Sequence, residues 1–395
     1  MVRAIVGGKL ITITQGIIED GTILIQDGKI VKVGPRTDIE VPADAELIDA
    51  AGKWVTPGFI DAHSHIGLFG EPSVWATRDG NEMTDPITPH LRGIDSFNPD
   101  DPAIPDVVAA GVTAVYTTPG SANIIGGTGL MVKLRGRTVD DMLVPGVEHM
   151  KMALGENPKR VYGEMRKKFP ATRMGNAAAL RSALVQAQNY LDKLSRAQAE
   201  AEDKEPRLPE RNLKWEALGK VLRREMKARI HCHRADDILT AIRIAEEFNL
   251  DYTIEHCTEG YKIADLLAEK QVKVTVGPLF MGRGKMELKD VTLANAGLLA
   301  KAGVHVSLQM DTTSGTKFLP VATGLVVREG MPEEAAFRAI TLNPAELLGV
   351  AHRMGSLEAG KDADIAIFDG HPFFTYTRCV HVLIDGETVY TYRPQ

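Results

Sequence analysis

Residues 55–66 read Val-Thr-Pro-Gly-Phe-Ile-Asp-Ala-His-Ser-His-Ile, and the rest of the fold can be worked out from this stretch. An apolar run ends in a turn and presents two histidines, His63 and His65, two positions apart. Residues two apart on an extended strand point to the same side. Both imidazoles can therefore reach one point at the end of a strand, and neutral imidazole is the commonest metal ligand in proteins. The pair predicts a metal site if other strands bring further ligands to the same place.

Short apolar runs recur through residues 57–352, mostly with helical stretches between them. This alternation is typical of βα units around a parallel sheet. It predicts an α/β fold, a (β/α)8 TIM-type barrel whose sites form at the C-terminal strand ends, with an open doubly wound sheet as the competing arrangement. The eight runs are Phe59–Ile60 leading to His63, Val112–Tyr116, Leu130–Leu134, His149–Ala153, Ala228–His231, Tyr252–His256, Val272–Val276 and Val304–Leu308.

The two ends of the chain have a different sequence pattern, in which apolar and polar residues alternate in short runs broken by Gly and Asp. Gln26–Lys29, for example, carries the Asp-Gly signal of a hairpin turn. We expect residues 1–56 and 353–395 to form one small composite β-sandwich domain, and residues 57–352 to form the barrel.

Two insertions interrupt the barrel pattern. Residues 66–106 are rich in Pro, Asp, Asn and Gly, which predicts a long loop over the barrel mouth. Residues 176–227 read as helices and form a helical insertion that could serve a contact between copies of the chain. On this ground we expect a homo-oligomer.

Composition narrows the class of protein. A net charge of −6 argues against a nucleic-acid partner, and no apolar run approaches the roughly 18 residues of a membrane helix. Three cysteines in a chain of 395 residues predict reduced thiols and a cytoplasmic location. We expect Cys232 and Cys257 to fill core positions, because each directly follows a histidine and alternation turns it away from that histidine's face.

Polar residues at the ends of the other predicted strands supply partners for the first histidine pair. Three histidines and a carboxylate suit a borderline divalent cation such as zinc, with iron or manganese as alternatives. A lysine becomes a ligand only if it is neutral or carbamylated, and a carbamate would bridge two ions; otherwise it is an ion-paired residue or a substrate contact. One or two ions therefore remain open. The residues are Lys151, His231, His233, His256 and Asp311.

Four motifs resemble the amidohydrolase superfamily, specifically its imidazolonepropionase-like and prolidase-like members. The resemblance implies a barrel with a metal centre, a terminal β-sandwich and hydrolysis of C–N bonds. Together with the flanking sheets, the motifs cover essentially the whole chain. They are Thr56–His65, Ile254–His256, Thr341–Ala345 and Gly355–Asp364.

The resemblance places His63, His65, His256 and Asp311 at the family's metal-ligand positions. For the fifth strand it favours His231 over His233, with Lys151 as in the lysine-containing branch that binds two ions. The chain departs from imidazolonepropionases after the fifth-strand histidine, where Cys-His-Arg replaces Ala-Asp-Glu. The sequence therefore does not name the substrate.

These expectations define a mechanism on a small-molecule substrate. Water activated by the metal would attack an amide or cyclic amide, with Asp311 as general base and then acid, and with His233 or His256 stabilising the oxyanion. Arg234, Asn123 and Arg92 are candidate substrate contacts. The alternatives are a dipeptidase, a deaminase of a small heterocycle, and a barrel without catalytic activity.

Overall fold

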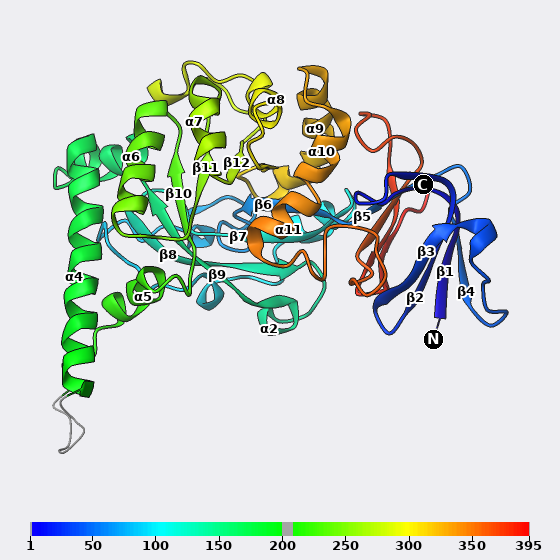
Figure 1. Cartoon of the computed structure of the whole chain (residues 1–395), viewed down its shortest axis with the longest axis horizontal. Helices are drawn as coiled ribbons and strands as arrows, with labels where there is room; N and C mark the ends of the chain where they lie inside the picture. The colour runs from blue at the N-terminus through cyan, green and yellow to red at the C-terminus, as the bar shows by residue number, and fades with distance from the viewer. Residues whose placement is uncertain (1, 200–207, 395) are drawn as a thin grey trace.

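The structure, a computed structural model, describes residues 2–199 and 208–394. A barrel occupies the middle of the molecule, with a separate sheet at one end and the long helix α4 (Arg173–Ala199) at the other (Figure 1). Both ends of the chain lie in the separate sheet.

The separate sheet runs in the order β16-β15-β14-β5-β1-β2-β3, with β4 paired to β1. The N-terminal and C-terminal segments meet where β5 pairs antiparallel with β14, so each end completes the sheet of the other. Buried apolar side chains such as Ile5, Ile23 and Ile365 form its core. Its strands are β1 (Val2–Ile11), β2 (Ile17–Gln26), β3 (Lys29–Pro35), β4 (Glu46–Asp49), β5 (Trp54–Pro57), β14 (Ile365–Phe368), β15 (Cys379–Ile384) and β16 (Glu387–Thr391).

The predicted barrel is confirmed: eight strands pair in chain order from β6 to β13, and each overlaps one of the predicted runs. The ends of the barrel sheet meet at the mouth, where the N–H of Asp311 donates to the carbonyl of His63 over 3.1 Å. The strands are β6 (Phe59–Ser64), β7 (Val112–Thr117), β8 (Ile125–Lys133), β9 (Leu143–Ala153), β10 (Ala228–Cys232), β11 (Tyr252–His256), β12 (Val274–Val276) and β13 (Val306–Leu308).

One strand runs against the expected direction. β8 is antiparallel to both β7 and β9, so the prediction of a parallel βα unit at the third run was wrong. The cause is the length of the connections: residues 118–124 are too few for a crossover helix, which needs about a dozen residues. β7, β8 and β9 therefore form a meander, and β8 begins at the barrel mouth.

The loop at residues 66–106 is attached to the barrel through this irregular strand. β7 pairs only with the second half of β8, which leaves backbone groups of the first half free. The loop forms hydrogen bonds with these groups. The N–H of Thr88 donates to the carbonyl of Ile125 over 2.8 Å, and the N–H of Thr128 donates to the carbonyl of Leu91 over 2.9 Å. A long loop thus becomes an ordered part of the barrel wall.

The helices cover the outside of the barrel. In the expected helical insertion, α4 packs against α5, and residues 200–207 between them lie outside the described residues. Among the described helices, none has both the length and the apolar character needed to cross a membrane. The remaining helices are α1 (Ala103–Val108), α2 (Val139–Met142), α3 (Glu156–Lys159), α5 (Leu213–Leu222), α6 (Ala235–Glu247), α7 (Ala264–Glu269), α8 (Ala294–Lys301), α9 (Leu319–Arg328), α10 (Glu333–Ala339) and α11 (Leu342–Leu348).

A buried group of charges joins the barrel to the separate sheet. Lys133, at the end of β8, lies 2.8 Å from Asp362 and 2.9 Å from Asp364, and it also pairs with Asp385 in the turn before β16. Only 6% of the Lys133 side chain is exposed. Lys133 therefore lies between three carboxylates that would otherwise repel one another across the junction, and Lys29 and Arg353 also pair with Asp362.

We expect Lys133→Met to destabilise the protein by about 3–5 kcal/mol, because it leaves the buried carboxylate of Asp364 without its cation. Thermal and urea unfolding measure the change. Lys29→Met is the matched control: Lys29 pairs with the same Asp362, but 46% of its side chain is exposed. Its loss should cost less than about 1 kcal/mol. Equal stability of Lys133→Met and the wild type would contradict this role.

Candidate metal centre

The first group of candidate ligands lies where the barrel sheet closes. His63 and His65 come from the end of β6, and Asp311 follows β13. The three side chains offer ligand atoms that all lie within 4.8 Å of one another. The Asp311 carboxylate is 3.0 Å from Nε2 of His65 and 3.4 Å from Nε2 of His63. The histidine pair and Asp311 therefore converge, as expected for residues at the ends of barrel strands.

The second group consists of His231, His233 and His256, whose ligand atoms also lie within 4.8 Å of one another. They come from β10, the turn after it and β11. The ring centroids of His231 and His256 are 4.2 Å apart, and those of His256 and His63 are 5.1 Å apart. The two groups are thus neighbours in one site at the barrel mouth.

Lys151 lies at the first group. It projects from β9, only 1% of it is exposed, and its Nζ is 2.9 Å from Nε2 of His63. Among the described residues, that histidine is its one hydrogen-bond partner and no carboxylate lies within 4 Å of its Nζ. Burial lowers the pKa of Lys151 to about 8. A buried ammonium with so few partners is costly, so this position favours a neutral or modified amine.

The histidine rings are oriented by their second nitrogen. Nδ1 of His65 donates to the carbonyl of Thr118 over 2.7 Å, and Nδ1 of His256 donates to the carbonyl of Gly277 over 2.9 Å. Nδ1 of His63 donates to the Glu255 carboxylate over 2.8 Å. In each ring this leaves Nε2 with a lone pair, which is the arrangement of metal-ligating histidines.

Two nitrogens show that this set of donors fits a metal ion. Nε2 of His256 and Nδ1 of His231 are buried and have no hydrogen-bond partner among the described residues. Burial holds the pKa of His231 well below its usual value and lowers that of His256 to about 4, so both rings are neutral at pH 7. Neutral, buried and unpartnered nitrogens are what a divalent cation requires. They also favour His231 over His233, whose Nδ1 lies 2.7 Å from the Thr258 hydroxyl.

An unusual backbone conformation places one of these ligands. Alternation along β11 would turn Glu255 and His256 to opposite faces. Yet Glu255 contacts the His63 ring, and the His256 ring also lies beside it. His256 has φ of 69°, in the left-handed region, which redirects its side chain at the strand end. Asp311 has φ of 53° in the same way. Such conformations in residues other than glycine gather at functional sites.

A buried ion pair holds one of the candidate ligands, His63, through Glu255. Arg229 donates to both oxygens of Glu255, over 2.9 Å and 2.6 Å, and both side chains are almost completely buried. Arg229 also donates to the carbonyl of Ala62 over 2.7 Å. This pair was not predicted from the sequence, although the charged residue within each apolar strand run, Arg229 and Glu255, was a signal.

A second set of polar residues that the sequence analysis missed lies at the rim. Nζ of Lys285 is 3.4 Å from Nε2 of His233 and 2.9 Å from Oδ1 of Asn157. Nδ2 of Asn157 is in turn 3.4 Å from Nε2 of His231. Lys285 also pairs with the buried Glu287 over 2.6 Å. The loop that carries Lys285 has no regular pattern, so sequence alone does not bring it to the histidines.

The three residues expected to bind substrate have other partners. Asn123 is buried and holds the long loop, with Nδ2 2.8 Å from the carbonyl of Glu82. Arg234 pairs with Asp236 over 2.7 Å. Arg92 is exposed and lines a cleft formed by the long loop. Their part in substrate binding stays a prediction.

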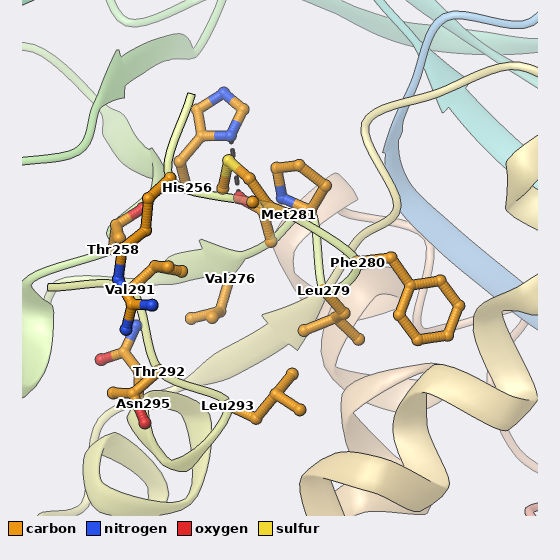
Figure 2. Close-up of a pocket in the computed structure, with 14 residues that line it drawn as sticks. His256, Thr258, Val276, Leu279, Phe280, Met281, Val291, Thr292, Leu293 and Asn295 are labelled. Atoms are coloured by element: carbon orange, nitrogen blue, oxygen red, sulfur yellow. Dashed lines mark hydrogen bonds between the residues drawn. The ribbon is translucent and has the colours of Figure 1, made fainter. Parts of the chain in front are cut away.

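A cavity of about 330 Å³ with a mixed polar and apolar lining adjoins His256. Figure 2 shows the His256 ring at one end of this cavity and Leu293 at the other, with Val276 and Leu279 between them. Arg283 also lines it. The cavity lies under the loop between β12 and α8, the same loop that carries Lys285.

Comparisons with known proteins agree with this geometry. A sequence model described as the amidohydrolase family matches residues 54–392. Amidohydrolase tasK of Hapsidospora irregularis is 32% identical over 93% of this chain, which spans only 39% of that protein. An imidazolonepropionase of Brevibacillus brevis is 26% identical, covering 94% of this chain and 88% of its own length. The crystal structure of an amidohydrolase from Thermotoga maritima MSB8 is 45% identical with a TM-score of 0.93, covering 98% of this chain and all of its own.

We expect Glu255→Gln to weaken zinc binding about 10- to 100-fold, because a neutral amide holds the His63 ring less firmly than a carboxylate does. Competition with a chromophoric chelator measures the affinity, and circular dichroism checks that the variant is folded. Thr253→Val is the control: Thr253 contacts only the oxygen of Glu255 that faces away from His63, so less than about a threefold change is expected. Unchanged zinc affinity in Glu255→Gln would show that His63 does not need this partner.

Proposed function

The chain belongs to the amidohydrolase family, and from this premise we propose that it is a metal-dependent hydrolase of a C–N bond in an amide or cyclic amide. The observation that carries the proposal is the meeting of the two ligand groups at the mouth of the barrel, with Lys151 beside them. The likeness to imidazolonepropionases supports cyclic amides among the candidate substrates.

The proposed ligands are His63, His65 and Asp311 for one ion and His231 and His256 for a second. When bound, a divalent ion lowers the pKa of a water molecule and polarises the scissile carbonyl. We propose zinc, because imidazole nitrogens and a carboxylate suit it, while iron or manganese would use the same donors. The unpartnered nitrogens of His231 and His256 support this assignment.

Asp311 is the proposed general base and acid. Its side chain is 23% exposed, so a water molecule and a substrate can reach it. It would accept the proton of the attacking water and return it to the leaving nitrogen, which completes the exchange without another acid. His233, in the second group, is the proposed donor to the oxygen of the tetrahedral intermediate. His256 is the alternative only if it does not hold the ion, because its Nδ1 donates to Gly277 and its Nε2 is the proposed ligand.

Lys151 is proposed to carry a carbamate. As an ammonium it would be a buried cation facing the nitrogen of a metal ligand, with no carboxylate in contact. As a carbamate it would supply two oxygens between the ligand groups, and this would allow the site to hold two ions.

We also propose a cellular compartment and an oligomeric state. The three cysteines are free and buried, which supports a reducing compartment such as the cytoplasm as the place where the protein functions.

Helices α4 and α5 at one end of the molecule are the proposed contact of a homo-oligomer. Light scattering that gave the 43.0 kDa mass of one chain would exclude the oligomer.

The function is tested with zinc-, manganese- or iron-reconstituted protein on N-acyl amino acids, cyclic amides and dipeptides. We expect release of an amine or opening of a cyclic amide, lost in His63→Ala and His65→Ala together with bound metal. Ammonia release from small heterocycles, without hydrolysis of any amide, would favour a deaminase. A protein that binds less than about 0.1 equivalent of metal after reconstitution would exclude metal-dependent hydrolysis altogether.

For Lys151→Ala we expect about half the metal content of the wild type, because the bridging oxygens are lost. Activity of apo-protein reconstituted with metal should rise with added bicarbonate, because it supplies the CO2 that the neutral amine of Lys151 takes up with loss of a proton. Lys151→Arg keeps the charge without accepting the same modification and serves as the control. An unchanged metal content in Lys151→Ala with a higher KM would instead identify Lys151 as a substrate contact.

A further inference from the structure

The loop between β12 and α8 brings a second cation to the site. Its segment Gly282-Arg-Gly-Lys285 places Lys285 at the rim, with Nζ 3.4 Å from Nε2 of His233. Among the described lysines and arginines, Lys151 and Lys285 are the two that contact a ring nitrogen of the histidine groups. Lys151 is completely buried, whereas 17% of the Lys285 side chain is exposed. Lys285 is therefore the cation that an arriving substrate can meet.

Lys285 is held in place from two sides. It donates to Oδ1 of Asn157 over 2.9 Å and pairs with Glu287 over 2.6 Å. Glu287 is fixed by reciprocal bonds with Glu156: each carboxylate accepts the backbone N–H of the other residue, over 2.9 Å and 3.2 Å. These bonds tie the loop to the turn after β9. An ammonium group positioned in advance loses less conformational entropy when it binds a ligand.

The rest of the loop suits an anionic ligand as well. Arg283 lines the cavity beside His256, and no carboxylate of the described residues lies within 4 Å of it; its Nε donates to the carbonyl of Lys289. Side chains at Gly282 and Gly284 would meet no atom within 4 Å, so packing does not require glycine at either position. What glycine adds there is backbone freedom on both sides of Arg283.

We propose that Lys285 selects substrates that carry a carboxylate near the scissile C–N bond, such as N-acyl amino acids or cyclic amides with an acidic side chain. This inference rests on the proposed hydrolase function and names the class of its substrate. A carboxylate placed at the rim accepts a charge-assisted hydrogen bond from the ammonium group. The amide then lies toward the histidines and Asp311.

Lys285 also has a structural role that must be separated from this one. Glu287 is completely buried, and a buried carboxylate without a cation is strongly destabilising. Lys285→Met alone would confuse the two roles. The double variant Lys285→Met/Glu287→Gln removes both charges, so it has no unpaired carboxylate but still lacks the ammonium group.

The test compares binding of N-acetylglycine and its neutral amide, N-acetylglycinamide, to zinc-loaded protein by calorimetry, with metal content measured for each variant. We expect the wild type to bind the carboxylate at least about tenfold more tightly, and the double variant to lose about 10- to 100-fold for the carboxylate but less than threefold for the amide. Lys285→Arg should keep most of the preference. Lys289→Met, on the same loop and 58% exposed at the side chain, should behave as the wild type.

Retention of the wild-type preference in the double variant would overturn the proposal, because Lys285 would then serve only to neutralise Glu287. A wild type without any preference for the carboxylate would overturn it as well. Binding needs no turnover, so this result is independent of the proposed function. If amides are hydrolysed but Lys285 has no effect on binding, the hydrolase function stands and the inference fails. If no amide is hydrolysed, the hydrolase function fails and the binding data still decide the role of Lys285.

Discussion

The site depends on one buried ion pair, between Arg229 and Glu255. Either charge alone in the interior would destabilise the protein by about 3–5 kcal/mol. The pair also joins four strands: Arg229 on β10 donates to the β6 carbonyl of Ala62 and stacks on Tyr116 of β7, 4.3 Å from the ring. Glu255 on β11 holds the ring of His63. The contacts of Glu255 therefore do two things at once: they neutralise the charge of Arg229, and they hold the ring of His63.

Much of the architecture could be predicted from periodicity. Each strand run, and the shared direction of His63 and His65, follows from short-range patterns that a sequence displays directly. His256 and Asp311 were expected beside them because each lies at the end of a predicted barrel strand. The direction of β8 does not, because an apolar run such as Leu130–Leu134 reads the same in either orientation and only the short connections decide it. The orientation of a strand in a sheet is decided by the length of the connections to its neighbours.

Glu255 and Lys285 were not predicted as part of the site, and His256 was predicted without its backbone conformation, for a different reason. Glu255 and His256 are adjacent, and alternation would separate them, but the left-handed backbone at His256 brings both toward His63. Lys285 lies far along the chain from Asn157, and its position depends on how a loop folds over the mouth. Local conformation and loop placement are set by the assembled protein, so neither is visible in a single sequence.

The separate sheet has a consequence for the newly made chain. Strands β1 to β5 are complete early in synthesis, but the partner of β5 is β14, which follows about 300 residues later. At roughly 5–20 residues per second, β5 would present an unpaired edge for on the order of 15–60 s. Open strand edges recruit other chains. During this time the edge of β5 can pair with other chains, so the growing polypeptide is prone to aggregate. A chaperone that covers this edge would prevent such pairing.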